Sequence, residues 1–155
     1  MPQIPFSLQP VLSYRESLVD MRTRELAHLE RQRREAQERL DVLRRAQRET
    51  WAVLQDRRVG RVNMTEIQLY MRYLDRLRGA IHEVRAHLAD LDRRIEAKRH
   101  ELLKAVEDKK IMEKLRDKAR QRFLETLERN DADFQDEMAL IQYVRNGSAA
   151  KEVWI

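Results

Sequence analysis

The stretch IQLYMRYLDRLRGAIHEVRAHLADLDRRIEAKRHEL, residues 67–102, carries the clearest pattern in the chain. Apolar residues recur in it every seven positions, and a second series follows three positions after the first. The first series is Ile67, Leu74, Ile81, Leu88, Ile95 and Leu102. The second series is Tyr70, Leu77, Val84 and Leu91. Such a repeat places an apolar stripe along an α-helix, so it predicts a long helix that packs on another helix along a narrow seam.

A weaker seven-residue repeat lies before this stretch and predicts the partner helix. Its apolar members are Leu12, Val19, Leu26, Leu29, Ala36, Leu40, Leu43 and Leu54. Arg33, Gln47 and Thr50 interrupt the repeat. Polar residues at seam positions weaken a coiled coil but fix its register, so these interruptions are compatible with the pattern.

Between the two repeats, the segment DRRVGRVNMTEIQ (residues 56–68) predicts a turn. Gly60 can adopt a left-handed conformation, and Asn63 with Glu66 resembles a capping box at the start of a helix. A connection this short brings the second helix back antiparallel to the first. We expect an all-α fold, a long antiparallel two-helix coiled-coil hairpin forming a single domain over residues 1–155. Its parts are a first helix over about 7–56, a turn over about 57–62, a longer second helix over about 63–146, ending near Gly147, and a flexible tail over 147–155.

The two expected helices differ in length, at about 75 Å and about 125 Å. If Leu54 faces Ile67, the numbers of paired residues add up to about 121, so Ser7 meets Lys114. The rest of the second helix then extends past the first. It carries a further apolar row, and large apolar side chains left in water forgo about 1.5 to 3 kcal/mol each. We therefore expect this free end to bind another molecule.

Composition excludes several other classes of protein. Charged residues make up 38% of the 155 positions, with only 3 Gly and 3 Pro, which suits long helices better than a compact globule. No apolar run is long enough to span a membrane, and no secretory leader is recognisable, so we expect a cytoplasmic protein. The absence of cysteine excludes disulfides, thiol catalysis and cysteine-based zinc sites.

Catalysis and cofactor binding are not expected. There is no glycine-rich phosphate loop, and a two-helix hairpin offers no concave pocket that could desolvate a substrate. No two of the histidines stand four residues apart, as a helical metal site needs; they are His28, His82, His87 and His100. We predict no enzyme, no cofactor and no metal. Nucleic-acid binding is also disfavoured, because acidic residues alternate with the basic ones through nearly every turn.

The charges are nevertheless arranged in blocks. Around the turn, six arginines face only Glu49 and Asp56; they are Arg44, Arg45, Arg48, Arg57, Arg58 and Arg61. Residues 104–122 hold eight basic and four acidic residues, and residues 125–137 hold six acidic residues and one basic residue. Such blocks suit electrostatic docking onto a complementary surface, although solvated helix faces would give the same composition.

Four motifs resemble the FliJ family, the small coiled-coil proteins of the bacterial flagellar type III export apparatus. They are F-x-L-Q-P-V-L-x-Y-R-E (6–16), E-I-Q-L-Y-x-x-Y-L-x-x-L (66–77), K-L-R-x-K-x-x-x-x-F (114–123) and D-E-M-A-L-I (136–141). The resemblance implies a stalk-like helical hairpin that binds the export ATPase, its regulator and the membrane export-gate platform protein, with a role as a general chaperone. It implies a peripheral location at the cytoplasmic face of the inner membrane, held by protein partners.

Two sets of site residues follow. For contact with the ATPase we expect the free end of the hairpin, namely Leu8, Val11, Leu12, Leu124, Leu127, Phe134, Met138 and Ile141. For the export gate, the resemblance implies the flank near the turn, namely Leu43, Tyr73, Leu77 and Ala80. Ala46 and Thr50 depart from the aromatics that relatives can carry there. Trp51 and Tyr73 lie beside the seam, where they either belong to this binding surface or widen the core.

Two hypotheses remain open from the sequence. In the first, the chain is a stalk, of the flagellar export apparatus or of a virulence-type injectisome, that promotes ATP hydrolysis by its partner and so promotes export. In the second, it is a tether or chaperone-escort protein whose free end binds export substrates or their chaperones, or pairs with a second copy. A self-pairing end predicts a concentration-dependent dimer in analytical ultracentrifugation.

Overall fold

The computed structural model describes residues 4–153, which form two α-helices and no strand. Helix α1 runs over Gln9–Arg57 (49 residues) and helix α2 over Met64–Val153 (90 residues). The contacts divide the chain into two units. The hairpin unit is Ser17–Val106, and the terminal unit combines Met1–Glu16 with Glu107–Ile155. The expected all-α hairpin with a longer second helix is confirmed.

The turn between the helices forms for the reasons that its sequence indicates. Gly60 has φ of +88°, a left-handed conformation that glycine adopts without steric cost. The Asn63 side-chain oxygen accepts hydrogen bonds from the backbone N–H groups of Thr65 (3.1 Å) and Glu66 (3.4 Å), which caps the first turn of α2. The Glu66 carboxylate in turn pairs with Arg57 across the turn at 3.4 Å. The Asn63 cap, the left-handed Gly60 and the Arg57–Glu66 ion pair together stabilise the short connection from α1 to α2.

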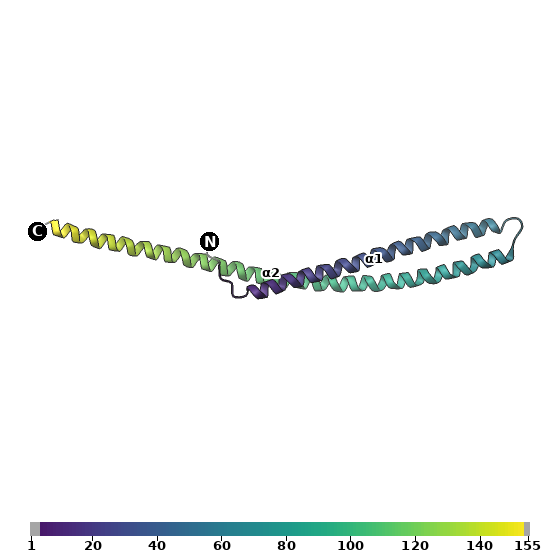
Figure 1. The fold of residues 1–155 in the computed structure, drawn as a ribbon, viewed down its shortest axis with the longest axis horizontal. Coiled ribbons are helices and arrows are strands. Elements are labelled where there is room, and N and C mark those ends of the chain that lie inside the picture. The colour runs from purple at the N-terminus through teal and green to yellow at the C-terminus, as the bar shows by residue number, and fades with distance from the viewer. Residues whose placement is uncertain (1–3, 154–155) are drawn as a thin grey trace. The chain divides into compact units, whose positions relative to one another are not determined.

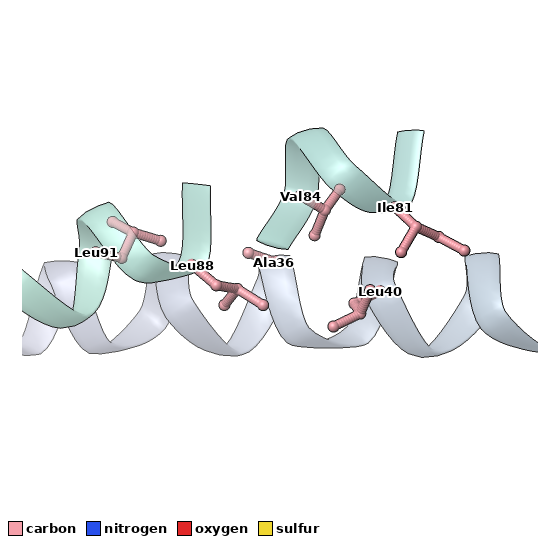
Figure 2. Close-up of a cluster of buried hydrophobic side chains, with 6 residues drawn as sticks. All are labelled: Ala36, Leu40, Ile81, Val84, Leu88 and Leu91. Carbon is pink, nitrogen blue, oxygen red and sulfur yellow. The ribbon is translucent and has the colours of Figure 1, made fainter. Parts of the chain in front are cut away.

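In the hairpin unit, α1 and α2 lie side by side (Figure 1). Two clusters of buried apolar side chains form the seam between them. Figure 2 shows one part of it, where α2 side chains point toward α1. This cluster consists of Ala36, Leu40, Ile81, Val84, Leu88 and Leu91. A second cluster near the turn consists of Leu54, Leu74 and Leu77, with Ile67 and Tyr70 packed against it. The seven-residue repeat of residues 67–102 therefore does form the seam.

Ion pairs across the seam give its register. The residue numbers add up to 123 in the pairs Arg22–Glu101 (3.3 Å), Glu25–Lys98 (2.7 Å) and Arg57–Glu66. This is close to the value of about 121 expected from the sequence. Two of the polar interruptions also find partners: Arg33 pairs with Asp92, and the hydroxyl of the buried Thr50 donates to the Ala46 carbonyl at 2.7 Å. The seam thus tolerates these residues without leaving a buried polar atom unpaired.

In the terminal unit, the N-terminal segment lies against α2. Leu12 of this segment and Met112 of α2 are both buried, and Arg15 pairs with Asp108 of α2 at 3.3 Å. Further along, Ile4, Phe6 and Gln9 share a shallow groove with Arg116, Asp117 and Arg120. Every residue of α2 from 124 to 149 is exposed. The N-terminal segment therefore covers α2 only as far as about Phe123.

The helix boundaries differ from the expected ones mainly at the end of α2. Helix α1 begins at Gln9 and ends at Arg57, and α2 begins at Met64, each within two residues of the expectation. Helix α2 does not end near Gly147 but continues to Val153, so the expected flexible tail is helical over residues 147–153. Gly147 lacks the positive φ of a helix-terminating glycine, and the good helix former Ala149 stands two residues later. Residues 154–155 of the expected tail lie outside the described residues.

Candidate functional site

The exposed part of α2 carries a row of large apolar side chains. We call this row the C-terminal stripe: Leu124, Leu127, Phe134, Met138 and Ile141. Their exposed fractions range from 38% for Leu127 to 63% for Phe134. At 3.6 residues per turn the five side chains fall within about 100° of one another around the helix axis. The stripe therefore has the width of a helix face that is normally buried, yet it has no partner in the described residues.

The structure treats the three expected N-terminal contact residues differently. Leu8 and Val11 are 41% and 39% exposed, so both offer surface to a partner. Leu12 is fully buried. Because Leu12 has no exposed surface, it holds the N-terminal segment in the terminal unit and cannot itself touch a docked protein.

Further apolar residues near the end of α2 were missed by the sequence analysis. Leu140, Tyr143 and Val144 are 63%, 76% and 58% exposed and lie on other sides of the helix than the C-terminal stripe. A shallow apolar groove joins Leu140 and Val144 to Ile141. The signal that could have found them is the dense run MALIQYV, residues 138–144, which is apolar on more than one face. Residues 138–144 of α2 are thus apolar on more than one side of the helix.

The expected gate-binding residues, which we call the turn flank, lie at and beside the seam of the hairpin unit. Leu77 is buried in the cluster with Leu54, and Leu43 packs against both apolar clusters. Ala80 is half-buried, whereas Tyr73 is 45% exposed. Of the four, Tyr73 therefore offers most of the accessible surface, and Leu77 supports the flank from within.

The two sides of the seam can be told apart by their residue numbers. On one side, Gln32 and His87 line a groove and their numbers add up to 119. On the other side, Glu30 and Arg99 form an ion pair at 3.6 Å and line a separate groove, and their numbers add up to 129. An antiparallel pair of helices keeps such sums constant along each side, because one number rises as the other falls.

These sums place the two exposed aromatics near the turn on opposite sides of the hairpin unit. Tyr73 falls opposite Ala46, with a sum of 119, whereas Trp51 falls opposite Arg78, with a sum of 129. Trp51 is 37% exposed, so both rings lie beside the core with a face in solvent. The turn flank therefore belongs to the Tyr73 side and does not include Trp51.

Farther from the turn, a network of charged side chains links α1 to α2 beside the seam. Lys98 donates to Glu25 (2.7 Å) and to Glu101 (3.0 Å), and Arg22 contacts both carboxylates. The hydrogen bond from Lys98, followed by that from Arg22, lowers the pKa of the Glu25 carboxyl. The hydrogen bonds to Glu25 and Glu101 raise the pKa of Lys98. Both shifts favour the charged forms, as structural ion pairs do.

The part of the chain that the structure describes holds no group of three or more His, Cys, Asp or Glu side chains placed to hold a metal ion. Within residues 4–153, neither helix combines the length and the apolar character that crossing a membrane requires. The surface features of the chain are the C-terminal stripe, the turn flank and the arginines near the turn.

Comparison with known proteins gives one match. Residues 5–148 match the family model described as flagellar FliJ protein. No curated protein and no solved structure matches the chain. The family match spans both helices, the turn, the turn flank and the C-terminal stripe.

Proposed function

Because the chain belongs to the FliJ family and is a component of the flagellar protein export apparatus, we propose that it serves there as a non-enzymatic stalk. The C-terminal stripe, with Leu8 and Val11, binds the export ATPase. The turn flank binds the membrane export-gate platform protein. These protein contacts hold the chain at the cytoplasmic face of the inner membrane.

The observation that carries this proposal is the uncovered C-terminal stripe. All five side chains lie on one helix face, and every residue from 124 to 149 is exposed. Contiguous apolar surface of this kind is uncommon on a soluble protein unless it binds something. The stripe residues recur three, four or seven positions apart, so they project from one helix face. Such a row can enter an apolar groove between two helices of a partner.

The charges favour a different protein over a second copy of this chain. An antiparallel pair that sets Leu127 against Phe134 also sets Glu125 against Asp136, because both pairs of numbers add up to 261. The same register sets Glu128 against Asp133. Self-pairing through the C-terminal stripe would thus bring like charges together, which opposes association.

Such a stalk would act on its partner's conformations. On a partner built as a symmetric ring, a single asymmetric helix contacts the subunits unequally. If the contacts are stronger in one subunit conformation than in another, docking shifts the population toward that conformation. Hydrolysis is then promoted without any catalytic group from this chain.

The test is ATP turnover by the cognate flagellar export ATPase with and without the full-length chain. The double variant Leu127→Asp, Phe134→Asp should lose the stimulation while its helical circular dichroism stays unchanged, because both side chains are exposed. The matched control is Leu140→Asp, Tyr143→Asp, which places the same two charges off the stripe and should retain more of the stimulation. Unchanged stimulation by the stripe variant would refute the docking assignment.

Gate binding is tested separately, with the cytoplasmic domain of the export-gate platform protein. Tyr73→Ala should weaken binding to this domain, since Tyr73 is the most exposed member of the turn flank. Trp51→Ala, on the opposite side of the seam, is the control and should bind as the parent does. Equal losses of gate binding in the two variants would show that the two sides of the seam are not distinct.

Analytical ultracentrifugation of the chain alone should show a monomer at all concentrations, and a concentration-dependent dimer would favour self-pairing instead.

A further inference from the structure

A second surface lies near the turn on the side of the hairpin unit that the turn flank does not use. Its residues follow from the sum of 129 that the ion pair Glu30–Arg99 sets for this side. The sum puts Arg44 opposite Arg85 and Trp51 opposite Arg78. Met71 lies seven residues before Arg78, about two helical turns closer to the connection between α1 and α2. We call this surface the arginine face: Arg44, Trp51, Met71, Arg78 and Arg85, together with Arg48, which lies about one helical turn after Arg44 on α1.

The arginine face carries positive charge that the hairpin unit does not neutralise. Arg44, Arg48 and Arg85 take part in no ion pair or hydrogen bond among the described residues. Arg78 reaches only Asp75, at 3.9 Å, and both of these side chains are more than 70% exposed. The positions beside the seam on this side near the turn, residues 44, 51, 71, 78 and 85, include no Asp or Glu.

The same side is neutralised farther from the turn. There, Glu30 pairs with Arg99, and Arg33 at the seam pairs with Asp92. In coiled coils the positions beside the seam usually pair opposite charges, and like charges there oppose helix pairing. Placing Arg44 against Arg85 therefore weakens the hairpin locally, and an acidic partner would relieve this repulsion.

The residue types on this face are those of protein interfaces. Tryptophan, methionine and arginine are enriched in interfaces and lysine is depleted, and the stretch from 42 to 78 contains nine arginines and no lysine. Arginine also binds carboxylates through two parallel hydrogen bonds, which lysine cannot do. Trp51 and Met71 are 37% and 40% exposed, so they offer apolar surface beside the seam. A helix with an apolar row and carboxylates beside that row matches this combination of apolar and cationic groups.

We propose that the arginine face docks an acidic amphipathic helix of a protein partner. The apolar row of this helix lies on Trp51 and Met71, and its carboxylates pair with Arg44, Arg78 and Arg85. This surface goes beyond the proposed contacts with the ATPase and the gate. The chain therefore presents two sides near its turn, an apolar one bearing Tyr73 and a cationic one bearing Trp51.

The first experiment measures binding of a synthetic probe to the full-length chain. The probe is a fluorescein-labelled, alanine-based helical peptide with leucines along one face and glutamates on both sides of them. A matched peptide has glutamine in place of every glutamate. We expect the acidic peptide to bind, with an affinity that falls as salt is added, and the glutamine peptide to bind at least about tenfold more weakly. Equal binding of the two peptides, or no binding of the acidic one, would overturn the proposal.

Variants of the chain then locate the peptide. Arg44→Glu and Trp51→Ala should each lower the affinity by about tenfold. The controls are Tyr73→Ala on the other side of the seam and Arg31→Glu on an exposed position of α1 away from the turn, and both should bind as the parent does. An equal loss in Arg31→Glu would show that net charge alone attracts the peptide, contrary to the proposal. Neither result depends on the ATPase or on the gate protein.

A stability measurement separates a docking role from a structural one. Arg85→Glu should raise the melting temperature of the unbound chain by about 1 to 3 °C, because it replaces the repulsion from Arg44 by an ion pair. The same variant should bind the acidic peptide more weakly than the parent chain does. A lowered or unchanged melting temperature would mean that the two arginines do not oppose each other and would overturn the proposal. Equally strong, arginine-dependent binding of phosphatidylglycerol vesicles or duplex DNA would also overturn the assignment to a protein helix.

Discussion

Residues 67–102 and residues 124–149 belong to the same helix α2, yet they stand in opposite situations. The first stretch buries its apolar row against α1, with Leu91 fully inaccessible and Leu74 and Ile95 nearly so. The second stretch has an apolar row of similar size, and every one of its residues is exposed. Helical apolar periodicity therefore identifies a face that will bind, while the length of the partner segment decides whether the binding happens within the chain.

Hydrogen exchange should show the largest difference between these two stretches. An isolated helix gains little stability from its own hydrogen bonds, so amides of residues 124–149 open by local fraying, whereas amides of residues 81–95 open only when the hairpin unfolds. We expect the C-terminal amides to exchange at least on the order of a hundredfold faster. Exchange read out by mass spectrometry on the full-length chain measures this.

Adding the export ATPase extends the same measurement. Docking through the C-terminal stripe should slow exchange in residues 124–149 and leave residues 81–95 nearly unchanged. Equal exchange rates in the two stretches of the free chain would contradict the comparison, since they would mean that the exposed part of α2 is stabilised in some other way.

Truncating one leucine in each stretch tests the comparison energetically. Leu91→Ala removes a fully buried side chain and leaves a cavity in the cluster of Figure 2, which should cost about 2 to 5 kcal/mol. Leu140→Ala removes a side chain that is 63% exposed and should change stability by less than about 0.5 kcal/mol. Urea unfolding followed by circular dichroism gives both values. A similar loss in the two variants would argue that Leu140 is packed in solution.

Two glycines allow the same substitution to be made with opposite expected signs. An alanine Cβ at Gly60 or at Gly147 would meet no atom within 4 Å, so only the backbone conformation matters. Gly60→Ala should destabilise the hairpin by about 1 to 2 kcal/mol, because a left-handed φ is strained for alanine. Gly147→Ala should instead increase the helix content near the end of α2, where glycine costs up to about 1 kcal/mol relative to alanine. Thermal melts and the ellipticity at low temperature read out the two effects, and a stabilising Gly60→Ala would contradict the observed turn.

The sequence predicted the hairpin well because each local signal agreed with the others. The repeat from Ile67 to Leu102 predicted the seam, Gly60 and Asn63 predicted the turn, and the limited length of the first helix predicted the uncovered end of α2. These features depend on periodicity and on backbone chemistry, both of which can be read from neighbouring residues. The register needed one assumption, Leu54 facing Ile67, and came close to the observed one.

The candidate site was less predictable, because exposure depends on what packs nearby. Leu12 and Leu77 belong to the seven-residue repeats and also to the two expected contact sets, and the structure shows that both are buried and offer almost no surface to a partner. Gly147 resembled a helix stop, but glycine ends a helix only when the chain takes a left-handed conformation there. The assignment of Tyr73 and Trp51 to opposite sides needed the register of the ion pairs, which the sequence does not contain.

The smallest expected effect concerns the charged network of the hairpin unit, for which the exposed stretch of α2 has no counterpart. The pKa of Glu25 is lowered by the hydrogen bonds from Lys98 and Arg22, so the unfolded chain binds a proton at this carboxyl before the folded chain does. The stabilisation is therefore present above the ordinary pKa of a glutamate and is lost as the pH falls through the lowered value. The raised pKa of Lys98 has the opposite sign: its contribution is present below the ordinary pKa of a lysine and is lost as the pH rises through the raised value.

Melting temperatures should thus be level near neutral pH and fall in acid. Glu25→Gln should lower the melting temperature at neutral pH slightly and make its decrease in acid, the acid limb, less steep. Glu128→Gln is the control, because Glu128 lies in the exposed stretch and has no ion pair among the described residues. An acid limb that Glu25→Gln leaves unchanged would show that the network contributes nothing to holding α1 and α2 together.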